Sequence, residues 1–262
     1  MLPFLHFGSL TVNTYALMYA LMYWIIGCYG FARVSRLPHP PQVLGRAMIL
    51  VICGLFLGSI APGLVQTLAE WVATGRFVWH RSIRVIGGLL VTLPLAWIYL
   101  RRHGIPIGRA FDLGGLPVPL GLAVGRLGCL AAGCCGGATS NSCVALKMPD
   151  LDGVWAVRYP TQIGSMAADL AIYAVLLGWE KYGAGKTRQE KTYPFDGFLF
   201  LLFLELYFVK RFLVQFLRAD NIPIWGALSL MHLFFLAGIA AVSLAVAVCW
   251  RRAAAGTSPA VR

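Results

Sequence analysis

The chain has 262 residues, of which 59% are hydrophobic and only 12% are charged, whereas soluble globular domains carry about 25% charged residues. This composition excludes an ordinary soluble enzyme or binding domain and indicates a polytopic membrane protein. The net charge of +12 does not indicate a nucleic-acid partner, because the basic residues form short clusters between apolar runs, a pattern typical of membrane orientation and of contact with anionic lipid head groups.

Seven apolar runs are each long enough, at about 20 residues, to cross roughly 30 Å of hydrocarbon. The first run has neither a basic segment before it nor a small-residue cleavage pattern after it, so we expect it to stay in the mature protein. We predict an all-α integral membrane protein with one domain over residues 1–262 and a disordered basic tail from about residue 251. The predicted transmembrane helices are Thr14–Val34, Leu44–Leu68, Ser82–Leu100, Phe111–Gly133, Gln162–Trp179, Phe195–Leu217 and Gly226–Trp250.

The positions of Lys and Arg predict the orientation of these helices. If the N-terminus lies outside, the inner connections hold most of the basic residues and the outer connections hold few. Basic residues concentrate in cytoplasmic loops, so we predict that the N-terminus is outside and the C-terminus inside. The unusual residues of several spans then share one depth near the outer surface, and they are Tyr15, Gly87, Gly88, Arg126, Gln162, Lys210, Arg211, Arg218 and His232.

Arg126 lies inside a predicted span, in the segment Gly125–Gly137, which is rich in glycine and cysteine. A guanidinium in hydrocarbon costs several kcal/mol unless it is paired or hydrated, so an intramembrane arginine indicates function. A structural ion pair is the alternative, but few carboxylates are expected at this depth. A planar guanidinium holds a phosphate through two hydrogen bonds, so the expected ligand is an anion such as a phospholipid phosphate.

Two more arginines, Arg211 and Arg218, lie seven residues apart and therefore on one face of a helix. For Arg211, deeper in the span, we favour a functional role. Arg218 either extends to the interface or contacts a ligand, and both interpretations stay open. Lys210 faces another way and can extend its amine to the interface.

Four cysteines, Cys129, Cys134, Cys135 and Cys143, form a cluster in the sequence. Their spacing is not a standard zinc pattern and no histidine is near them, so we predict no metal site and no cofactor. Packing as a small residue is the expected role of Cys129. A disulfide between Cys143 and either Cys134 or Cys135 stays open, and a catalytic thiol is the weaker alternative because no base is evident beside it.

Three smaller features each have a structural interpretation beside the functional one. The pair Gly87 and Gly88 is typical of helix contact, and Tyr15 is typical of the aromatic belt at the membrane interface. Gln162 follows Pro160 and Thr161, a plausible start of a helix.

The segment Gly125–Gly137 resembles the signature of the prolipoprotein diacylglyceryl transferase family. The resemblance covers nearly the whole chain in the same order. It extends to Tyr15–Tyr19, to Arg102–Pro106 with Asp112, Leu113 and Pro117, to Arg158–Gln162 and to Tyr207–Arg218.

The resemblance implies a function. Members of the family move the diacylglyceryl group of phosphatidylglycerol to the thiol of a lipobox cysteine in a preprolipoprotein signal peptide, which is the first step of bacterial lipoprotein maturation. It implies a transferase in the inner membrane, among membrane lipids, with its site toward the outer leaflet. Arg126 would bind the phosphate and Arg211 would be the second catalytic arginine. The implied substrate-binding residues are Arg126, Gly137, Tyr15, Gly87, Gly88, Gln162 and Arg218.

The chain departs from the family pattern at several positions. Cys129 replaces an asparagine, and Ile86 replaces the histidine before the Gly-Gly pair. Gln215 and Ser165 replace glutamates. The general base therefore stays open between Tyr15, His80, His232 and deprotonation by another route. The alternatives are a lipid transferase with another acceptor and a non-catalytic phospholipid-binding or interaction protein.

Overall fold

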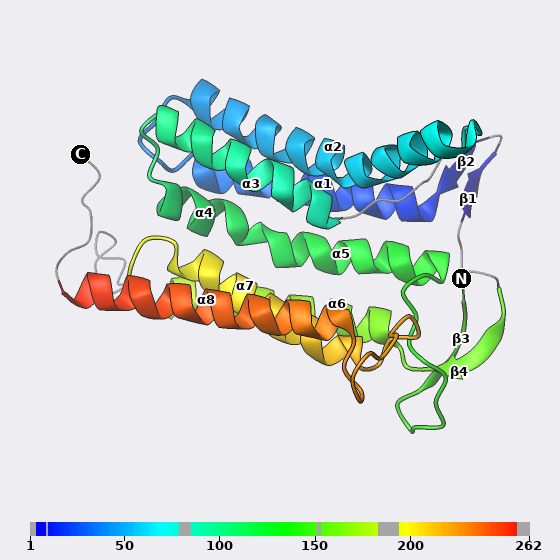
Figure 1. Cartoon of the computed structure of the whole chain (residues 1–262). Coiled ribbons are helices and arrows are strands. Elements are labelled where there is room, and N and C mark those ends of the chain that lie inside the picture. Colours follow the sequence, from blue (N-terminus) through cyan, green and yellow to red (C-terminus); the bar gives the residue numbers. More distant parts are fainter. Residues whose placement is uncertain (1–3, 9, 79–84, 151–152, 183–193, 256–262) are drawn as a thin grey trace. The chain divides into compact units, whose positions relative to one another are not determined.

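The computed structural model describes residues 4–8, 10–78, 85–150, 153–182 and 194–255 (Figure 1). Most of this structure is helical, and two short antiparallel hairpins pair β1 (Phe4–Phe7) with β2 (Leu10–Asn13) and β3 (Leu146–Pro149) with β4 (Trp155–Arg158). The helices are α1 (Thr14–Val34), α2 (Pro41–Thr74), α3 (Val85–Arg102), α4 (Ile107–Gly115), α5 (Pro117–Ala132), α6 (Thr161–Tyr182), α7 (Phe198–Gln215) and α8 (Leu230–Ala254).

The predicted class of helical membrane protein is confirmed. Within the described residues, five helical segments are long and apolar enough to cross a membrane, and they are Thr14–Val34, Pro41–Thr74, Ile107–Ala132, Thr161–Lys181 and Leu230–Ala254. α7 is not among these segments, because it carries three charged residues, Glu205, Lys210 and Arg211. The number of spans and their orientation stay predictions.

The fourth predicted span, Phe111–Gly133, falls in the membrane-crossing segment Ile107–Ala132, which a one-residue break at Leu116 divides into two helices. α4 ends at Gly115 and α5 starts at Pro117, whose missing N–H and fixed φ suit the first turn of a helix. At the other end of the chain, α8 continues to Ala254, and residues 256–262, where most of the predicted disordered tail falls, lie outside the described residues.

The chain divides into two compact units, residues 1–26 with 111–262 and residues 27–110. In the second of these, α2 and α3 pack closely. A Cβ added at Gly88 would lie 2.6 Å from the backbone oxygen of Leu55 and 2.7 Å from Oγ of Ser59. Gly88 therefore allows close contact between the two helices, which is the structural interpretation of the glycine pair given from the sequence.

The first unit contains the start of α1, α5–α8 and both hairpins. The glycines of α5 let α1 approach, since a Cβ at Gly121 would lie 2.5 Å from Cγ1 of Ile26, and one at Gly128 would lie 3.0 Å from Cβ of Met18. The buried carboxylate of Asp112 accepts hydrogen bonds from the backbone N–H groups of Gly197 at 2.7 Å and Phe200 at 3.0 Å, at the first turn of α7.

Chain reversals gather the candidate site residues at one end of this unit. α5 and α7 end there, α6 and α8 begin there, and the β3–β4 hairpin lies beside them (Figure 1). Arg126 near the end of α5 and Arg218 just beyond the end of α7, which are 92 positions apart in the sequence, are thereby placed in the same region.

Candidate functional site

The loop after α5 is fixed against the start of α6. Gly133 ends α5 in the left-handed conformation, with φ of 72°. Thr161 Oγ1 then donates to the backbone oxygen of Cys135 at 2.8 Å, and Gln162 Nε2 donates to that of Cys134 at 2.9 Å. Gln162 is only 2% exposed, so its position at the predicted helix start serves to hold this loop.

Gly137 lies where three chain segments meet. Its N–H donates to the oxygen of Tyr159 at 3.2 Å, and the next residue, Ala138, donates to the oxygen of Leu217 at 2.8 Å. A Cβ on Gly137 would lie 2.4 Å from the Tyr159 oxygen and 2.9 Å from the Leu217 oxygen. Only glycine fits this position, which forms a β-bridge with Arg218.

The three predicted arginines belong to one electrostatic group. The charge of Arg211 on α7 interacts with those of Arg126 on α5 and Arg218 beyond the end of α7. Arg126 and Arg211 are partly buried, and neither makes a hydrogen bond or ion pair within the part of the chain that the structure describes. The Arg211 guanidinium lies over the ring of Phe235, 5.3 Å from its centroid.

Arg218, in contrast, has a carboxylate partner. Its Nε and Nη2 donate to the two oxygens of Asp220 at 2.7 and 2.6 Å, a bidentate pair. These hydrogen bonds hold the pKa of the Asp220 carboxyl below its usual value. Neither interpretation of Arg218 from the sequence, extension to the membrane interface or contact with a ligand, included this pair with Asp220.

Lys210 does not extend to the interface, and that interpretation is wrong. Its amine makes an ion pair with Asp169 of α6 and lies 4.4 Å from the ring centroid of Tyr207. Lys210 is 6% exposed and Asp169 is 0% exposed. Asp169 is not among the residues predicted from the sequence, although a carboxylate seven residues after Gln162 in an apolar helix, hence on the same face, is a signal for it.

A cavity of about 330 Å³ opens beside the loop and the β3–β4 hairpin. Arg158, which the sequence analysis did not place in the site, lies on its wall with its guanidinium 2.7 Å from the carboxylate of Asp150. The cavity is therefore lined by residues of the loop and by two arginines, Arg158 and Arg218. Its walls include Cys135, Gly136, Gly137, Asp150, Arg158, Gln162 and Arg218.

Of the candidates for a general base, two are described by the structure. Tyr15 stacks on Tyr19 with ring centroids 4.4 Å apart, and the Tyr19 hydroxyl lies 3.8 Å from the Cys129 sulfur. His232 is fully buried, and its Nδ1 accepts the backbone N–H of Ser229 at 3.0 Å. His232 therefore caps α8. His80 lies outside the described residues.

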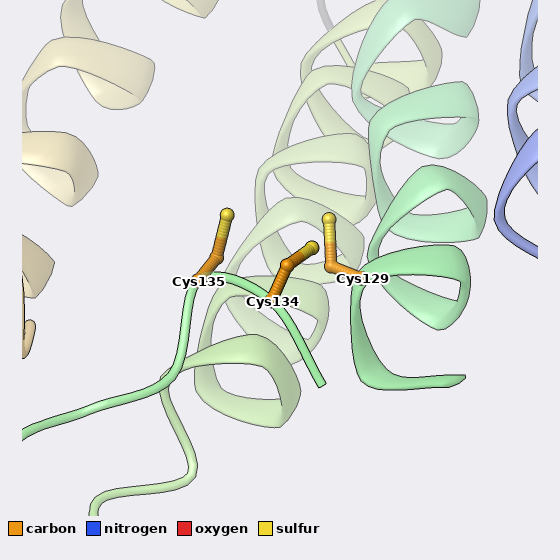
Figure 2. A group of neighbouring side chains, drawn as sticks. All are labelled: Cys129, Cys134 and Cys135. Carbon is orange, nitrogen blue, oxygen red and sulfur yellow. The ribbon is translucent and has the colours of Figure 1, made fainter. Parts of the chain in front are cut away.

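Three of the cysteines come together although their spacing predicted no site. The Sγ atoms of Cys129, Cys134 and Cys135 all lie within 4.8 Å of one another, and Figure 2 shows the side chains turned to the same side of the loop. All three are free thiols, as is the exposed Cys143, so the structure contains none of the disulfides considered from the sequence.

Gly87 and Gly88 lie on α3 and belong to the other compact unit. Ile86, at the position of the histidine in the family pattern, precedes them on the same helix. Their participation in the site therefore stays a prediction.

The chain is similar to known proteins of one family over most of its length. Residues 3–250 match the family model of prolipoprotein diacylglyceryl transferase. A phosphatidylglycerol–prolipoprotein diacylglyceryl transferase of Chromohalobacter salexigens is 28% identical over 221 residues, which cover 82% of this chain and 78% of that protein. A protein of the same name from Dehalococcoides mccartyi is 27% identical, and the match covers 82% of this chain and 80% of that protein. Another from Pseudomonas paraeruginosa is 26% identical, and the match covers 89% of each chain. The chain therefore belongs to the prolipoprotein diacylglyceryl transferase family.

Proposed function

We propose that the protein transfers the diacylglyceryl group of phosphatidylglycerol to the thiol of a lipobox cysteine in a preprolipoprotein. The thiol sulfur attacks the glycerol carbon, the bond from that carbon to the phosphate oxygen breaks, and glycerol phosphate leaves. The names of the relatives at 26–28% identity support both substrates. The sulfur nucleophile belongs to the substrate, so the protein has to bind the phosphate, stabilise the leaving group and help to remove the thiol proton.

The observation that carries this proposal is the pair of partly buried arginines that make no hydrogen bond or ion pair within the described residues, since Asp169, the carboxylate that interacts with both, is paired with Lys210. Arg126 and Arg211 come from different helices and interact electrostatically, and Arg218 extends the cationic group to the cavity. A phosphate between them would offset charges that are otherwise costly to bury. Arg126 would bind the phosphate in the ground state, and Arg211 would stabilise the negative charge that builds up on the leaving oxygen.

The other predicted residues would shape the site around this anion. Gly137 and Gln162 would position the loop that lines the cavity, and Tyr15 would complete the site from α1. We also propose the predicted orientation, with seven crossings in the bacterial inner membrane, the N-terminus outside and the site toward the outer leaflet. The excess of basic residues in the connections of the opposite side supports this orientation.

The proposal is tested by transfer from labelled phosphatidylglycerol to a lipobox peptide in vesicles. We expect Arg126→Ala and Arg211→Ala each to lower the transfer rate by about 100-fold or more, as the loss of a group that stabilises transition-state charge does. Arg251→Ala, at the exposed end of α8, is the matched control and should keep the wild-type rate. Equal rates for Arg126→Ala and the control would refute the assignment.

A second candidate is a phospholipid-binding protein without transferase activity. It is favoured by one observation, because the Nδ1 of His232, one of the candidate general bases, is committed to the cap of α8. In that case phosphatidylglycerol binds in an Arg126-dependent manner and no thioether forms. A transferase with another acceptor instead turns over the lipid without modifying the peptide.

A further inference from the structure

The three clustered thiols have the geometry of an incomplete metal site. A metal ion bound to sulfur at about 2.3 Å places three sulfurs of a trigonal set about 4 Å apart. The Sγ atoms of Cys129, Cys134 and Cys135 lie within 4.8 Å of one another, so small side-chain rotations bring them to this spacing (Figure 2). The sulfur of Cys129, in the last turn of α5, and those of Cys134 and Cys135, in the loop that follows, thus lie around one point.

The backbone of this cluster is already fixed. Cys135 has a left-handed backbone, with φ of 61°, which is uncommon for a residue other than glycine. Its carbonyl and that of Cys134 are held by the side chains of Thr161 and Gln162. Outer hydrogen bonds of this kind orient metal ligands, and a strained backbone persists where the surroundings determine it.

The local charges suit a thiolate cluster. Arg126 interacts electrostatically with Cys129 and Cys135, and Arg218 interacts with Cys135. Three thiolates around a divalent ion carry one net negative charge, and the two guanidinium groups offset it at low cost. Sulfur donors without oxygen or nitrogen partners select thiophilic ions over Mg²⁺ or Ca²⁺.

We propose that Cys129, Cys134 and Cys135 bind one Zn²⁺ ion as thiolates and leave its fourth position open. Zinc prefers four ligands, and sites with three protein ligands keep the fourth for water or substrate. Cys135 lines the 330 Å³ cavity, which gives the ion a route of entry and gives the open position a neighbouring space for a ligand.

The open position would take the thiol of the acceptor peptide, and this step rests on the transferase function proposed above. A thiol bound to zinc is deprotonated, so its proton passes to water and the sulfur becomes the nucleophile. The sulfur–carbon bond forms, the carbon–oxygen bond to the phosphate breaks, and the electron pair leaves with glycerol phosphate. Zinc would thereby do what a general base would otherwise do.

Metal content tests the site without reference to activity. The reduced protein, purified in detergent, is stripped of metal and titrated with Zn²⁺, and with Co²⁺ as a spectroscopic probe of thiolate ligands. We expect one equivalent per chain and a thiolate-to-cobalt absorption band for the wild type and for the control Cys143→Ser. Cys129→Ser, Cys134→Ser and Cys135→Ser should each weaken binding by at least about tenfold. Because a serine variant can fail to fold, the wild-type cobalt spectrum is the second measurement.

Three outcomes would overturn the site: no metal uptake by the reduced protein, equal binding by the three variants and the control, or binding of Cu⁺ but not of Zn²⁺. For the thiol step, we expect removal of zinc to lower transfer by about 100-fold and its return to restore it, with phosphatidylglycerol binding unchanged. Transfer that is independent of bound zinc would overturn the thiol step. Transfer that is absent with and without zinc would overturn the proposed function, while the metal titration still decides the site.

Discussion

Gly136 and Gly137 are neighbours with opposite steric surroundings, and they offer a paired test of the loop. A Cβ on Gly137 would lie 2.4 Å from the backbone oxygen of Tyr159 and 2.9 Å from that of Leu217. A Cβ on Gly136 would meet its nearest atom, Nε2 of Gln162, at 3.7 Å, an ordinary contact. We therefore expect Gly137→Ala to destabilise the protein and Gly136→Ala to leave its stability nearly unchanged.

The magnitude follows from the atoms involved. Overpacking costs about 1–3 kcal/mol, and the upper end applies to Gly137 because the opposing oxygens are held by hydrogen bonds from Gly137 and Ala138 and cannot retreat independently. Either glycine-to-alanine change also lowers the conformational entropy of the unfolded chain, which stabilises the folded protein by about 0.4–1 kcal/mol. The net cost for Gly137→Ala is about 2 kcal/mol, or a Tm lower by roughly 4–8 °C for a chain of this size.

The assay is thermal unfolding of both variants in the same detergent, followed by transfer of the diacylglyceryl group. Gly137→Ala should also lower transfer, because the β-bridge from Gly137 to Arg218 positions a guanidinium on the cavity wall. A Tm of Gly137→Ala within 1–2 °C of that of Gly136→Ala would refute the steric argument. Normal stability with lost activity would instead assign Gly137 a direct contact with substrate.

Two further predictions concern the ion pairs around the site. Lys210→Met should destabilise the protein by about 3–5 kcal/mol, because it removes the ion-pair partner of the buried Asp169, and the double variant with Asp169→Leu should recover most of this loss in thermal unfolding. For Asp220, whose pKa is lowered by its hydrogen bonds to Arg218, the stabilisation is present above the unfolded pKa of about 4 and is lost as the pH falls through the lower folded value. Tm measured from pH 6 to pH 2 should therefore fall less for Asp220→Asn than for the wild type, and parallel curves would contradict the pairing.

Much of the helical structure could be predicted because hydrophobic length decides it. The bounds of α1 agree with the predicted span Thr14–Val34, and the other predicted spans coincide with helices whose ends differ by several residues. The break between α4 and α5 was missed, since Pro117 was read as part of a continuous apolar run. Proline at the first turn of a helix is a start signal that the apolar composition around it obscured.

The site could be predicted from the sequence only at residues whose charge is energetically costly inside a membrane span. Arg126 and Arg211 stand out because a charged residue in an apolar span requires an explanation. The cluster of Cys129, Cys134 and Cys135 does not stand out, because its spacing fits no zinc pattern and the convergence depends on the left-handed turns at Gly133 and Cys135. The loop that contains Cys134 and Cys135 is held by hydrogen bonds to the start of α6, which lies about 30 residues further along the chain.

The basic residues around the site differ in whether they form an ion pair with a carboxylate, and this difference distinguishes a structural role from ligand binding. Lys210 has a buried carboxylate and Arg218 a bidentate one, so both charges are balanced within the fold. Arg126 and Arg211 make no hydrogen bond or ion pair in the described chain, and Asp169 of α6, the carboxylate that interacts with both, is already paired with Lys210. A carboxylate paired directly with either arginine would lower the cost of burying it, but would also occupy the place of an anionic ligand. A site that binds phosphate has to leave its cations unbalanced in the free protein, and the ligand then supplies the missing charge.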